Sequence, residues 1–509
     1  MIQDWPWLRV SPPIIAIALA IIFREVNFAL LLAMFSGCLL LHDLSWTSSV
    51  TTFCDVLVGQ VADADHASVI LFTVLLGAMI GVMNDSGGTK AVVDRLATFA
   101  DTRRKGQILT WLAGLVVFFD DYANTMLIGG SMRPLADKLK ISRAKLAFLI
   151  DATAAPVAGL ALSTWTAFEI GQVQAGLQQA GIDASAQSVF LATIPFRIYP
   201  LLAIVAVAAF AICGRDFGPM LKAEQAAADA VESETAETSP EHAQSRGIAL
   251  FAVLPIAMLV AVVWNGYSPD VDAYRLLLTA SLASATTAAV LPWLFRRMTL
   301  AECSSSWVSG ITSMIPAIVV LVLAWAISDV CRPGKLDTAG YIVSLIGDSV
   351  RPEFLPTVAF AAAGAIAVAI GSSFTTMSLL LPIFIPLTWT LISAAAPQTT
   401  VDDPLFLATI GAILAGAIFG DHCSPISDTT VLSSAAAGCD HLQHVATQLP
   451  YAMVVAVCSI LFGYLPIGFG VPWWIALPLS AATCVSIILF LGTEPTSRSA
   501  SDVAAGDIR

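Results

Sequence analysis

The apolar stretch Phe406–Phe419 runs directly into a polar one, Gly420-Asp421-His422-Cys423-Ser424-Pro425-Ile426-Ser427-Asp428-Thr429-Thr430. This run places two carboxylates, a histidine, four hydroxyl side chains and a proline where further lipid-facing helix is expected. Backbone groups without partners cost several kcal/mol in hydrocarbon, and a charged side chain at the bilayer centre costs about 2.5–3.5 kcal/mol on insertion scales. A chain that keeps such a run is predicted to bind something polar there, inside protein and away from lipid.

The composition indicates a polytopic membrane protein. Hydrophobic residues make up 57% of the 509 residues and charged residues only 12%, against about 25% charged in a soluble domain. Apolar stretches of the length needed for a span number roughly 10 to 14. The net charge of −13 argues against nucleic acid as a partner, because nucleic acid requires a basic face. We therefore expect an all-α chain that crosses the lipid bilayer of a cell membrane several times.

An acidic segment divides the chain into two hydrophobic halves. Residues 214–247 carry seven acidic and three basic side chains, a composition that predicts a solvated, soluble linker without a core. The halves on either side are an N-terminal transmembrane half, 1–213, and a C-terminal transmembrane half, 248–493. The tail, 494–509, is rich in serine, alanine and aspartate and is expected to be disordered.

The two halves contain a weak internal sequence repeat. An apolar stretch leads into Asp120–Met126 in the first half and into Gly371–Met377 in the second. A second proline-broken polar element follows in each half, at 151–159 and at 420–430. Paired Gly/Pro-interrupted membrane segments in matching positions of two halves are the best sequence indication of a transporter's binding site. Two stretches are predicted to be re-entrant rather than spanning, 120–135 and 421–438.

The break at Pro425 is predicted to free backbone carbonyl groups beside a dense set of hydroxyls. Carbonyls, hydroxyls and a carboxylate are the oxygen ligands that a hard monovalent cation prefers. Helix N-termini directed at the gap would also favour an anionic substrate group. The alternative role of Asp421 and Asp428 is N-capping at a solvated loop, which for Asp428 is compatible with binding. The candidate binding residues of this element are Asp421, Ser424, Asp428, Thr429 and Thr430.

Two adjacent carboxylates, Asp120 and Asp121, follow an apolar stretch of the first half. Adjacent residues do not share a helix face, so one of them can point to the core and the other to water. A carboxyl group held in low dielectric can exchange a proton for a metal cation, which is the chemistry of cation/proton exchange. The alternative is a solvated pair in a loop. Asn124 is either an amide ligand or a turn residue.

Further candidates lie near the other broken elements. Asp151 and Glu169 are either proton or substrate partners, or are paired structurally with an arginine. Ser373 and Thr376 place hydroxyls on an otherwise apolar span, where the alternative is close helix packing through small residues. Thr153 is a neutral oxygen ligand. No P-loop motif is found, so ATP-driven transport has no support, and we expect neither an enzyme nor a bound cofactor.

Together these motifs resemble the NhaC-type sodium/proton antiporter family of the ion transporter superfamily. The resemblance covers nearly the whole chain apart from the linker and the tail. In the second half, Gly371–Met377 resembles the family's Gly-Thr-Ser-Trp-Gly-Thr-Met element but departs from it at Ser372, Phe374 and Thr375. The motifs that carry the resemblance are Phe119-Asp120-Asp121-Tyr122-Ala123-Asn124, Asp151-Ala152-Thr153-Ala154-Ala155-Pro156, Ser163-Thr164-Trp165 and 420–430.

The resemblance implies two inverted repeats, each with a re-entrant hairpin and a broken helix. It also implies a scaffold and a mobile transport domain in an elevator-like arrangement, sodium coupling and, often, a homodimer. It does not fix the cargo, since some relatives resemble sodium-coupled carriers of amino acids or organic acids.

Two hypotheses for function follow. The first is a secondary active antiporter of the bacterial inner membrane that exchanges Na+ for H+ by alternating access, with Asp120 or Asp121 and Asp428 as titrating groups. The second is Na+-coupled transport of a small amino acid or organic acid, because the hydroxyl-rich set exceeds what one cation needs. A channel is a third class, and the paired broken elements favour alternating access over it. Sodium, the coupling ion, is assigned to Asn124, Thr153, Ser424 and Asp428.

Overall fold

The structure, a computed structural model, describes residues 5–23, 25–96, 99–118, 121–160, 163–234, 249–266, 273–332, 334–338, 341, 350–395 and 400–495. These ranges are helical apart from turns, connections and one isolated β-bridge between Asp216 and Thr493. Within them, seven helices are long and apolar enough to cross a membrane, and three shorter apolar helices accompany them. The expected all-α, multi-pass membrane protein is thus confirmed.

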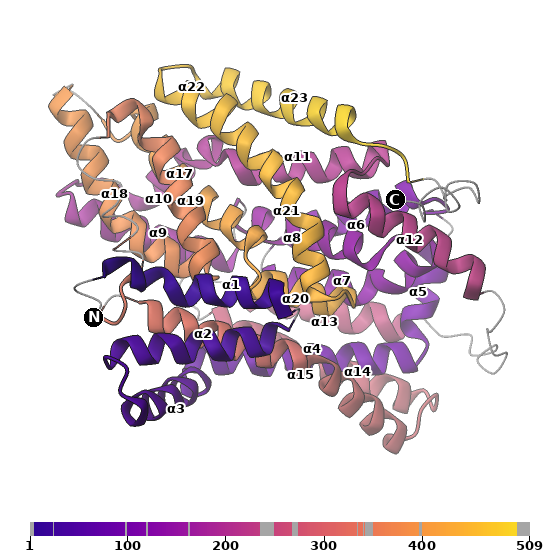
Figure 1. The fold of residues 1–509 in the computed structure, drawn as a ribbon. Coiled ribbons are helices and arrows are strands. Elements are labelled where there is room, and N and C mark those ends of the chain that lie inside the picture. Colours follow the sequence, from indigo (N-terminus) through magenta and orange to yellow (C-terminus); the bar gives the residue numbers. More distant parts are fainter. Residues whose placement is uncertain are drawn as a thin grey trace, which may run out of the picture.

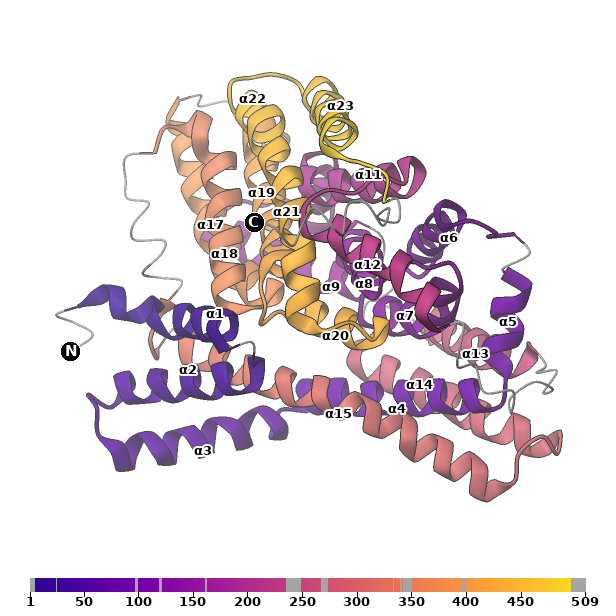
Figure 2. The same ribbon diagram turned by 45° about the vertical axis from the view of Figure 1, so that its right-hand side comes forward.

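A lower layer is formed by three helices from each half of the chain (Figure 2). They are α2 (Val26–Leu41), α3 (Trp46–Ala62), α4 (Ala64–Asp85), α13 (Leu250–Gly266), α14 (Ala273–Leu294) and α15 (Leu300–Cys331). The long helix α15 packs along α4 and α2, while α14 packs between α4 and α13. Glycines let α4 and α15 touch through their backbones: a Cβ on Gly81 would lie 2.9 Å from the Cα of Gly310, and one on Gly77 would lie 2.8 Å from the Gly310 carbonyl oxygen.

An upper body is built from most of the remaining helices of the chain (Figures 1 and 2). From the first half come α6 (Arg103–Val116), α7 (Asp121–Lys138), α8 (Arg143–Ala158), α9 (Thr164–Gln179), α10 (Ala186–Ala192), α11 (Ile198–Cys213) and α12 (Gly218–Glu234). From the second half come α17 (Leu355–Ile370), α18 (Ser373–Ala395), α19 (Pro404–Cys423), α20 (Asp428–Ala437), α21 (His441–Cys458), α22 (Leu465–Gly468) and α23 (Trp473–Leu491). Outside these two groups, α1 (Ser11–Phe23) packs on α2, and α5 (Gly88–Leu96) packs on α7 and α13.

Four interruptions in the upper body correspond to the polar elements found in the sequence. They separate α6 from α7, α8 from α9, α17 from α18, and α19 from α20. The helices that follow the interruptions pack across the two halves, α7 against α20 and α18 against α9. The breaks predicted before α7, α18 and α20 are therefore confirmed, and this packing brings them together. The proline-broken element predicted at 151–159 is wrong in position: α8 continues through Pro156 to Ala158, and the chain is interrupted only after it.

Two helices, α3 and α9, have no counterpart among the apolar stretches of the sequence. In α3, threonines, serines, an aspartate and a glutamine interrupt the apolar pattern, and α9 contains five glutamine or glutamate side chains. Both helices pack on other helices: α3 contacts α2, α4 and α15 with one face and exposes the rest, and α9 packs on α18 and α10. A criterion based on the length of apolar stretches does not detect helices whose pattern polar side chains interrupt.

The acidic segment 214–247 differs from the solvated linker that its composition predicts. Its first part forms α12, which packs against α8 and α21, while residues 235–247 lie outside the described residues. Two of its acids are buried with partners. The Asp216 carboxylate lies 2.5 Å from the Lys145 ammonium, and Glu224 accepts hydrogen bonds from the Ser142 backbone (2.7 Å) and from Arg103 (2.5 Å). These ion pairs, distant in sequence, order the segment.

We expect the Asp216→Ala substitution to destabilise the protein strongly. It would leave the fully buried Lys145 ammonium without its carboxylate and the Tyr451 hydroxyl without its acceptor at 2.7 Å. Breaking a buried ion pair in this way costs about 3–5 kcal/mol. The measurement is the melting temperature in detergent. The control is Glu494→Ala, whose partner Arg104 is half exposed and whose loss should cost about 1 kcal/mol or less. Equal effects of the two substitutions would contradict the anchoring role of Asp216.

Candidate functional site

Side chains donate hydrogen bonds to the backbone carbonyl groups that the helix breaks leave without partners. At the end of α6, the Asn124 amide donates to the carbonyls of Gly114 (2.7 Å) and Val117 (2.8 Å). At the end of α17, Ser424 donates to the Val368 carbonyl at 2.9 Å. The last four carbonyls of a helix lack partners within it, so these bonds satisfy groups that hydrocarbon cannot.

The break between α19 and α20 is closed in the same way. Thr430 donates to the Asp421 carbonyl at 2.9 Å, and Gln448 donates to the His422 carbonyl at 3.0 Å. An imidazole nitrogen of His441 lies 2.6 Å from the carbonyl oxygen of Pro425. The carbonyls of Asp421, His422 and Pro425, which the sequence predicted to be free for a cation, therefore already have hydrogen-bond partners.

The two helix breaks of the second half are in close contact. Gly371, between α17 and α18, has a left-handed φ of 72° that favours glycine. A Cβ there would lie 2.6 Å from the carbonyl oxygen of Ile426, in the α19–α20 break. This contact places the start of α18 beside the end of α19, where Ser373 donates a hydrogen bond to the carboxylate of Asp421.

Asp421 and Asp428 lie on either side of the α19–α20 break. Asp428 is the first residue of α20 and accepts hydrogen bonds from its neighbour Thr429 through the backbone N–H (2.8 Å) and from the Tyr122 hydroxyl. The first turn of a helix favours negative charge, and the last turn disfavours it. Asp421 lies in the last turn of α19, so its negative charge is unfavourable there unless a proton or a cation compensates it.

The first half contributes Asp121, which begins α7 and is buried, and its carboxylate accepts a hydrogen bond from the Trp165 indole at 2.9 Å. Its neighbour Tyr122 reaches Asp428, so the starts of α7 and α20 are tied together. Asp120 lies outside the described residues, and its predicted role is therefore not observed.

Among the buried oxygen atoms at these breaks, Oδ1 of Asp421 and Oδ1 of Asn124 have no hydrogen-bond partner among the described residues. The Asp421 carboxylate also interacts electrostatically with Asp428, Asp151 and Asp121, all of the same charge. Within the described chain, Asp421 and Asp428 make no ion pair with a lysine or arginine. The break region is thus a buried group of acids with unused oxygen atoms.

Asp151 has a different environment, because four side chains saturate its carboxylate. It accepts hydrogen bonds from Thr430 (3.2 Å) and Ser433 (3.1 Å) on α20, and from Gln448 (2.6 Å) on α21, and it lies 3.3 Å from a His444 nitrogen. All five residues are buried. Asp151 therefore joins α8 to α20 and α21, and it stands behind the break rather than open to a cavity.

Four other predicted residues form mainly structural contacts. Glu169 pairs with Arg197 at 2.8 Å, which is the arginine alternative left open by the sequence, and Arg197 also donates to the carbonyl of Gly159 at the end of α8. The hydroxyl of Thr153 donates within α8, to Leu149 (2.7 Å). Thr376 likewise donates within α18, to the carbonyl four residues earlier. Thr429 interacts with the Ser427 hydroxyl at 3.0 Å.

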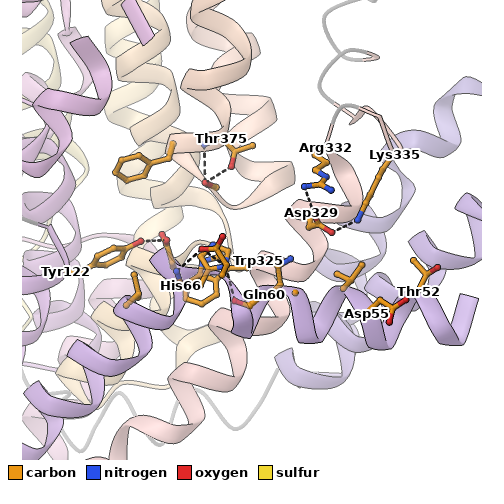
Figure 3. A pocket seen from close by; sticks show the side chains of 17 residues that line it. Thr52, Asp55, Gln60, His66, Tyr122, Trp325, Asp329, Arg332, Lys335 and Thr375 are labelled. Carbon is orange, nitrogen blue, oxygen red and sulfur yellow. Dashed lines mark hydrogen bonds and ion pairs between the residues drawn. The ribbon is translucent and has the colours of Figure 1, made fainter. Parts of the chain in front are cut away.

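A cavity of about 640 Å³ lies between the lower layer and the upper body, and Asp428 is on its wall (Figure 3). The upper body contributes Tyr122, Ser372, Phe374, Thr375 and Asp428 to this cavity. The lower layer and the turn after α15 contribute Thr52, Asp55, Val56, Gly59, Gln60, Asp63, His66, Val69, Trp325, Asp329, Arg332 and Lys335. Asp428 therefore connects the acidic break region to an open cavity of mixed polar and apolar lining.

Several residues that complete this region were not predicted from the sequence to have a role in it. Tyr122, Trp165 and Arg197 each bind a predicted acid, and His444 and Gln448 bind Asp151. The sequence feature that could have indicated them is their position as polar or aromatic side chains next to the broken elements, as in Asp121-Tyr122 and Ser163-Thr164-Trp165. Their partners lie up to 306 residues away, so sequence spacing does not reveal the pairs.

Buried acids at paired helix breaks define a membrane transporter of the ion-coupled class, and the comparisons with known proteins agree. The sequence model of the Na+/H+ antiporter family matches residues 157–469. An uncharacterized protein of Haemophilus influenzae is 32% identical over 504 residues, covering 95% of this chain and 94% of that protein. The chain belongs to the Na+/H+ antiporter family, a family of transporters rather than enzymes.

Two further similarities are more limited. A second Haemophilus influenzae protein, described as an uncharacterized Na+/H+ antiporter, is 46% identical over 65 residues, which are 12% of this chain and 14% of that protein. The crystal structure of the Alcanivorax borkumensis YdaH transporter covers 84% of this chain and 91% of its own, at 14% identity and a TM-score of 0.36. The expected family is confirmed by sequence.

We expect Gly371→Ala to destabilise the protein more than Gly470→Ala. Both glycines have a left-handed φ, 72° and 87°, and a side chain in that region costs about 1–2 kcal/mol. Only Gly371 is also packed against Ile426, whereas nothing lies within 4 Å of a Cβ at Gly470. Overpacking should add about 1–3 kcal/mol at Gly371. The measurement is the melting temperature of both variants in detergent, and an equal decrease would contradict the close contact between the breaks.

Proposed function

We propose that this protein is a secondary active antiporter that exchanges Na+ for H+ by alternating access in the bacterial inner membrane. The observation that carries the proposal is the meeting of three acids at the helix breaks: Asp121 and Asp421 are buried, and Asp428 is partly exposed on the cavity wall. Asp121 and Asp428 both lie within electrostatic range of Asp421. Carboxylates of like charge in low dielectric oppose one another's ionisation unless a cation lies among them. Such a group binds either protons or a cation, and that competition is what an antiporter requires.

The proposed Na+ ligands are oxygen atoms of both halves. The Oδ1 atoms of Asn124 and Asp421 are buried without partners, which supports their use as ligands. Asp428 supplies a carboxylate on the cavity wall. The hydroxyl groups of Ser424 and Thr153 donate their protons to carbonyls and still offer their oxygen atoms to a cation. Na+ requires oxygen ligands of this mixed kind, and no bound cofactor enters the proposal.

The arrangement of helices supports a mobile unit moving against a fixed one. In the proposal, the lower layer is the scaffold and the upper body is the transport domain, built from two inverted repeats. The reciprocal packing of α7 on α20 and of α18 on α9 is the pattern that a two-fold relation between repeats would produce. The cavity between layer and body supplies access from one side of the membrane. The proposed transporter is a homodimer, as the family resemblance implies.

We expect Asp421→Asn and Asp428→Asn each to abolish Na+-driven pH change in everted membrane vesicles. An amide can neither release a proton nor balance the charge of Na+, and loss of one charged ligand lowers affinity by about tenfold or more. The initial rate of acridine-dye fluorescence recovery after Na+ addition measures the exchange.

The matched control is Asp402→Asn, an exposed carboxylate in the turn before α19 that lies outside the proposed site. Its exchange rate should equal that of the unmodified protein. Normal exchange in both Asp421→Asn and Asp428→Asn would contradict the assignment of these acids. Absence of Na+-driven pH change in the unmodified protein, purified and reconstituted, would contradict the antiport function itself.

A further inference from the structure

The cavity beside Asp428 is much larger than a cation needs. A water molecule occupies about 30 Å³ of liquid volume, whereas this cavity measures about 640 Å³. That size falls within the range of about 300–1,000 Å³ typical of small-molecule sites. A wide aqueous approach also has this volume, so the chemistry of the lining decides what the cavity takes.

Charges of both signs line the cavity. Arg332 and Lys335 both bind the single carboxylate of Asp329, Arg332 at 3.0 Å, so this three-residue group has one positive charge in excess. Arginine offers a planar donor fork that matches a carboxylate. The group therefore provides a site for the carboxylate of a ligand.

The remaining charges of the wall are negative. Asp55, Asp63 and Asp428 face the same cavity, so its acids outnumber its two fixed cations by four to two when Asp329 is included. Figure 3 shows Asp329, Arg332 and Lys335 apart from Tyr122, beside which Asp428 lies, with His66 and Trp325 between them. A simple organic anion would meet excess negative charge here. A simple cation would be repelled by the excess positive charge that Arg332 and Lys335 retain beyond their pairing with Asp329.

An apolar surface lies between the charged groups. The Trp325 ring stacks on His66 with centroids 4.0 Å apart, and Phe374, Val56 and Val69 complete this surface. Phe374 also packs on Trp165 at 4.9 Å, and Trp165 binds Asp121. An apolar group of a ligand in the cavity would thus lie one side chain away from the residue that positions an acid of the ion site.

The departures from the family's Gly-Thr-Ser-Trp-Gly-Thr-Met element coincide with this lining. Ser372, Phe374 and Thr375, which differ from that element, all face the cavity. Ser373 and Thr376, which match it, are buried behind the wall, Ser373 on Asp421. The residues that match the family element thus lie on the side of the ion site. The residues that differ from it lie on the side that a larger ligand would contact.

We propose that this cavity binds a small zwitterion, an amino acid with an apolar side chain, whose carboxylate lies on Arg332 and Lys335 and whose ammonium lies among the acids. The inference rests on the proposed transport function, because it makes the cavity a loading site of the same transporter. It names the cargo class that shares the route with Na+.

The test uses purified full-length protein in detergent and three probes of one carbon skeleton. They are phenylalanine, its decarboxylated form 2-phenylethylamine and its deaminated form 3-phenylpropionate; leucine with isopentylamine and 4-methylpentanoate is a second series. Affinities come from ligand-dependent shifts of the melting temperature with Na+ present. We expect an amino acid of one series to bind at least about tenfold more tightly than both of its analogues, since each analogue loses one charge-assisted contact.

Binding of the amine as tightly as the amino acid, binding of the acid as tightly, or no binding of either series overturns the proposal. Na+-dependent stabilisation without any amino acid is measured in the same samples. If Na+ stabilises the protein and drives pH change while no zwitterion binds, this inference fails and the antiport function stands. If Na+ has neither effect, the antiport function fails instead.

Two variants locate the site. In Arg332→Gln/Lys335→Gln we expect the affinity for the amino acid to fall about tenfold or more, toward that of the amine. The control is Arg351→Gln, an exposed arginine outside the cavity, whose affinity should not change. If the double variant does not fold, the triple variant Ser372→Thr/Phe374→Trp/Thr375→Gly restores the family element. It should weaken amino-acid binding, and unchanged affinity in it overturns the proposed lining.

Discussion

The structure depends on satisfying backbone groups that helix breaks leave open inside a membrane. Each of the four breaks in the upper body ends a helix whose last carbonyls need donors, and lipid supplies none. Asn124, Arg197, Ser424 and Thr430 supply them, one at each break. Because these donors must reach the carbonyls, the breaks are packed together, and the acids beside them become neighbours.

The distinction between structural and functional polar residues follows from the same requirement. Asp151 has its carboxylate saturated by donors from α20 and α21, so it holds the break in place. Asp421 keeps an oxygen without a partner and lies at a helix end that disfavours its charge. Two buried aspartates with similar sequence surroundings therefore have opposite roles, and the difference lies in their donors.

Much of the upper body was predictable from local sequence. Pro425 and the hydroxyls around it correctly indicated a break, and the polar elements near residues 121 and 371 indicated two more. The pairs Tyr122–Asp428 and Ser373–Asp421 were not predictable, because they form between elements distant in the chain. The acidic segment was misjudged for a related reason: its composition resembles a solvated linker, but the buried Lys145 and the partly buried Arg103 pair with its acids. The composition of the segment gives the number of its charged side chains. Whether those side chains are buried depends on the positions of their partners in the fold.

The glycine contact between α4 and α15 has a mechanical consequence. A space that one methyl group would overfill leaves the two helices no room to slide or rotate against each other. These two helices therefore form a rigid pair within the lower layer. The boundary with the upper body contains the open volume of the cavity. In the proposed mechanism, any displacement of the upper body would meet α4 and α15 as a single unit.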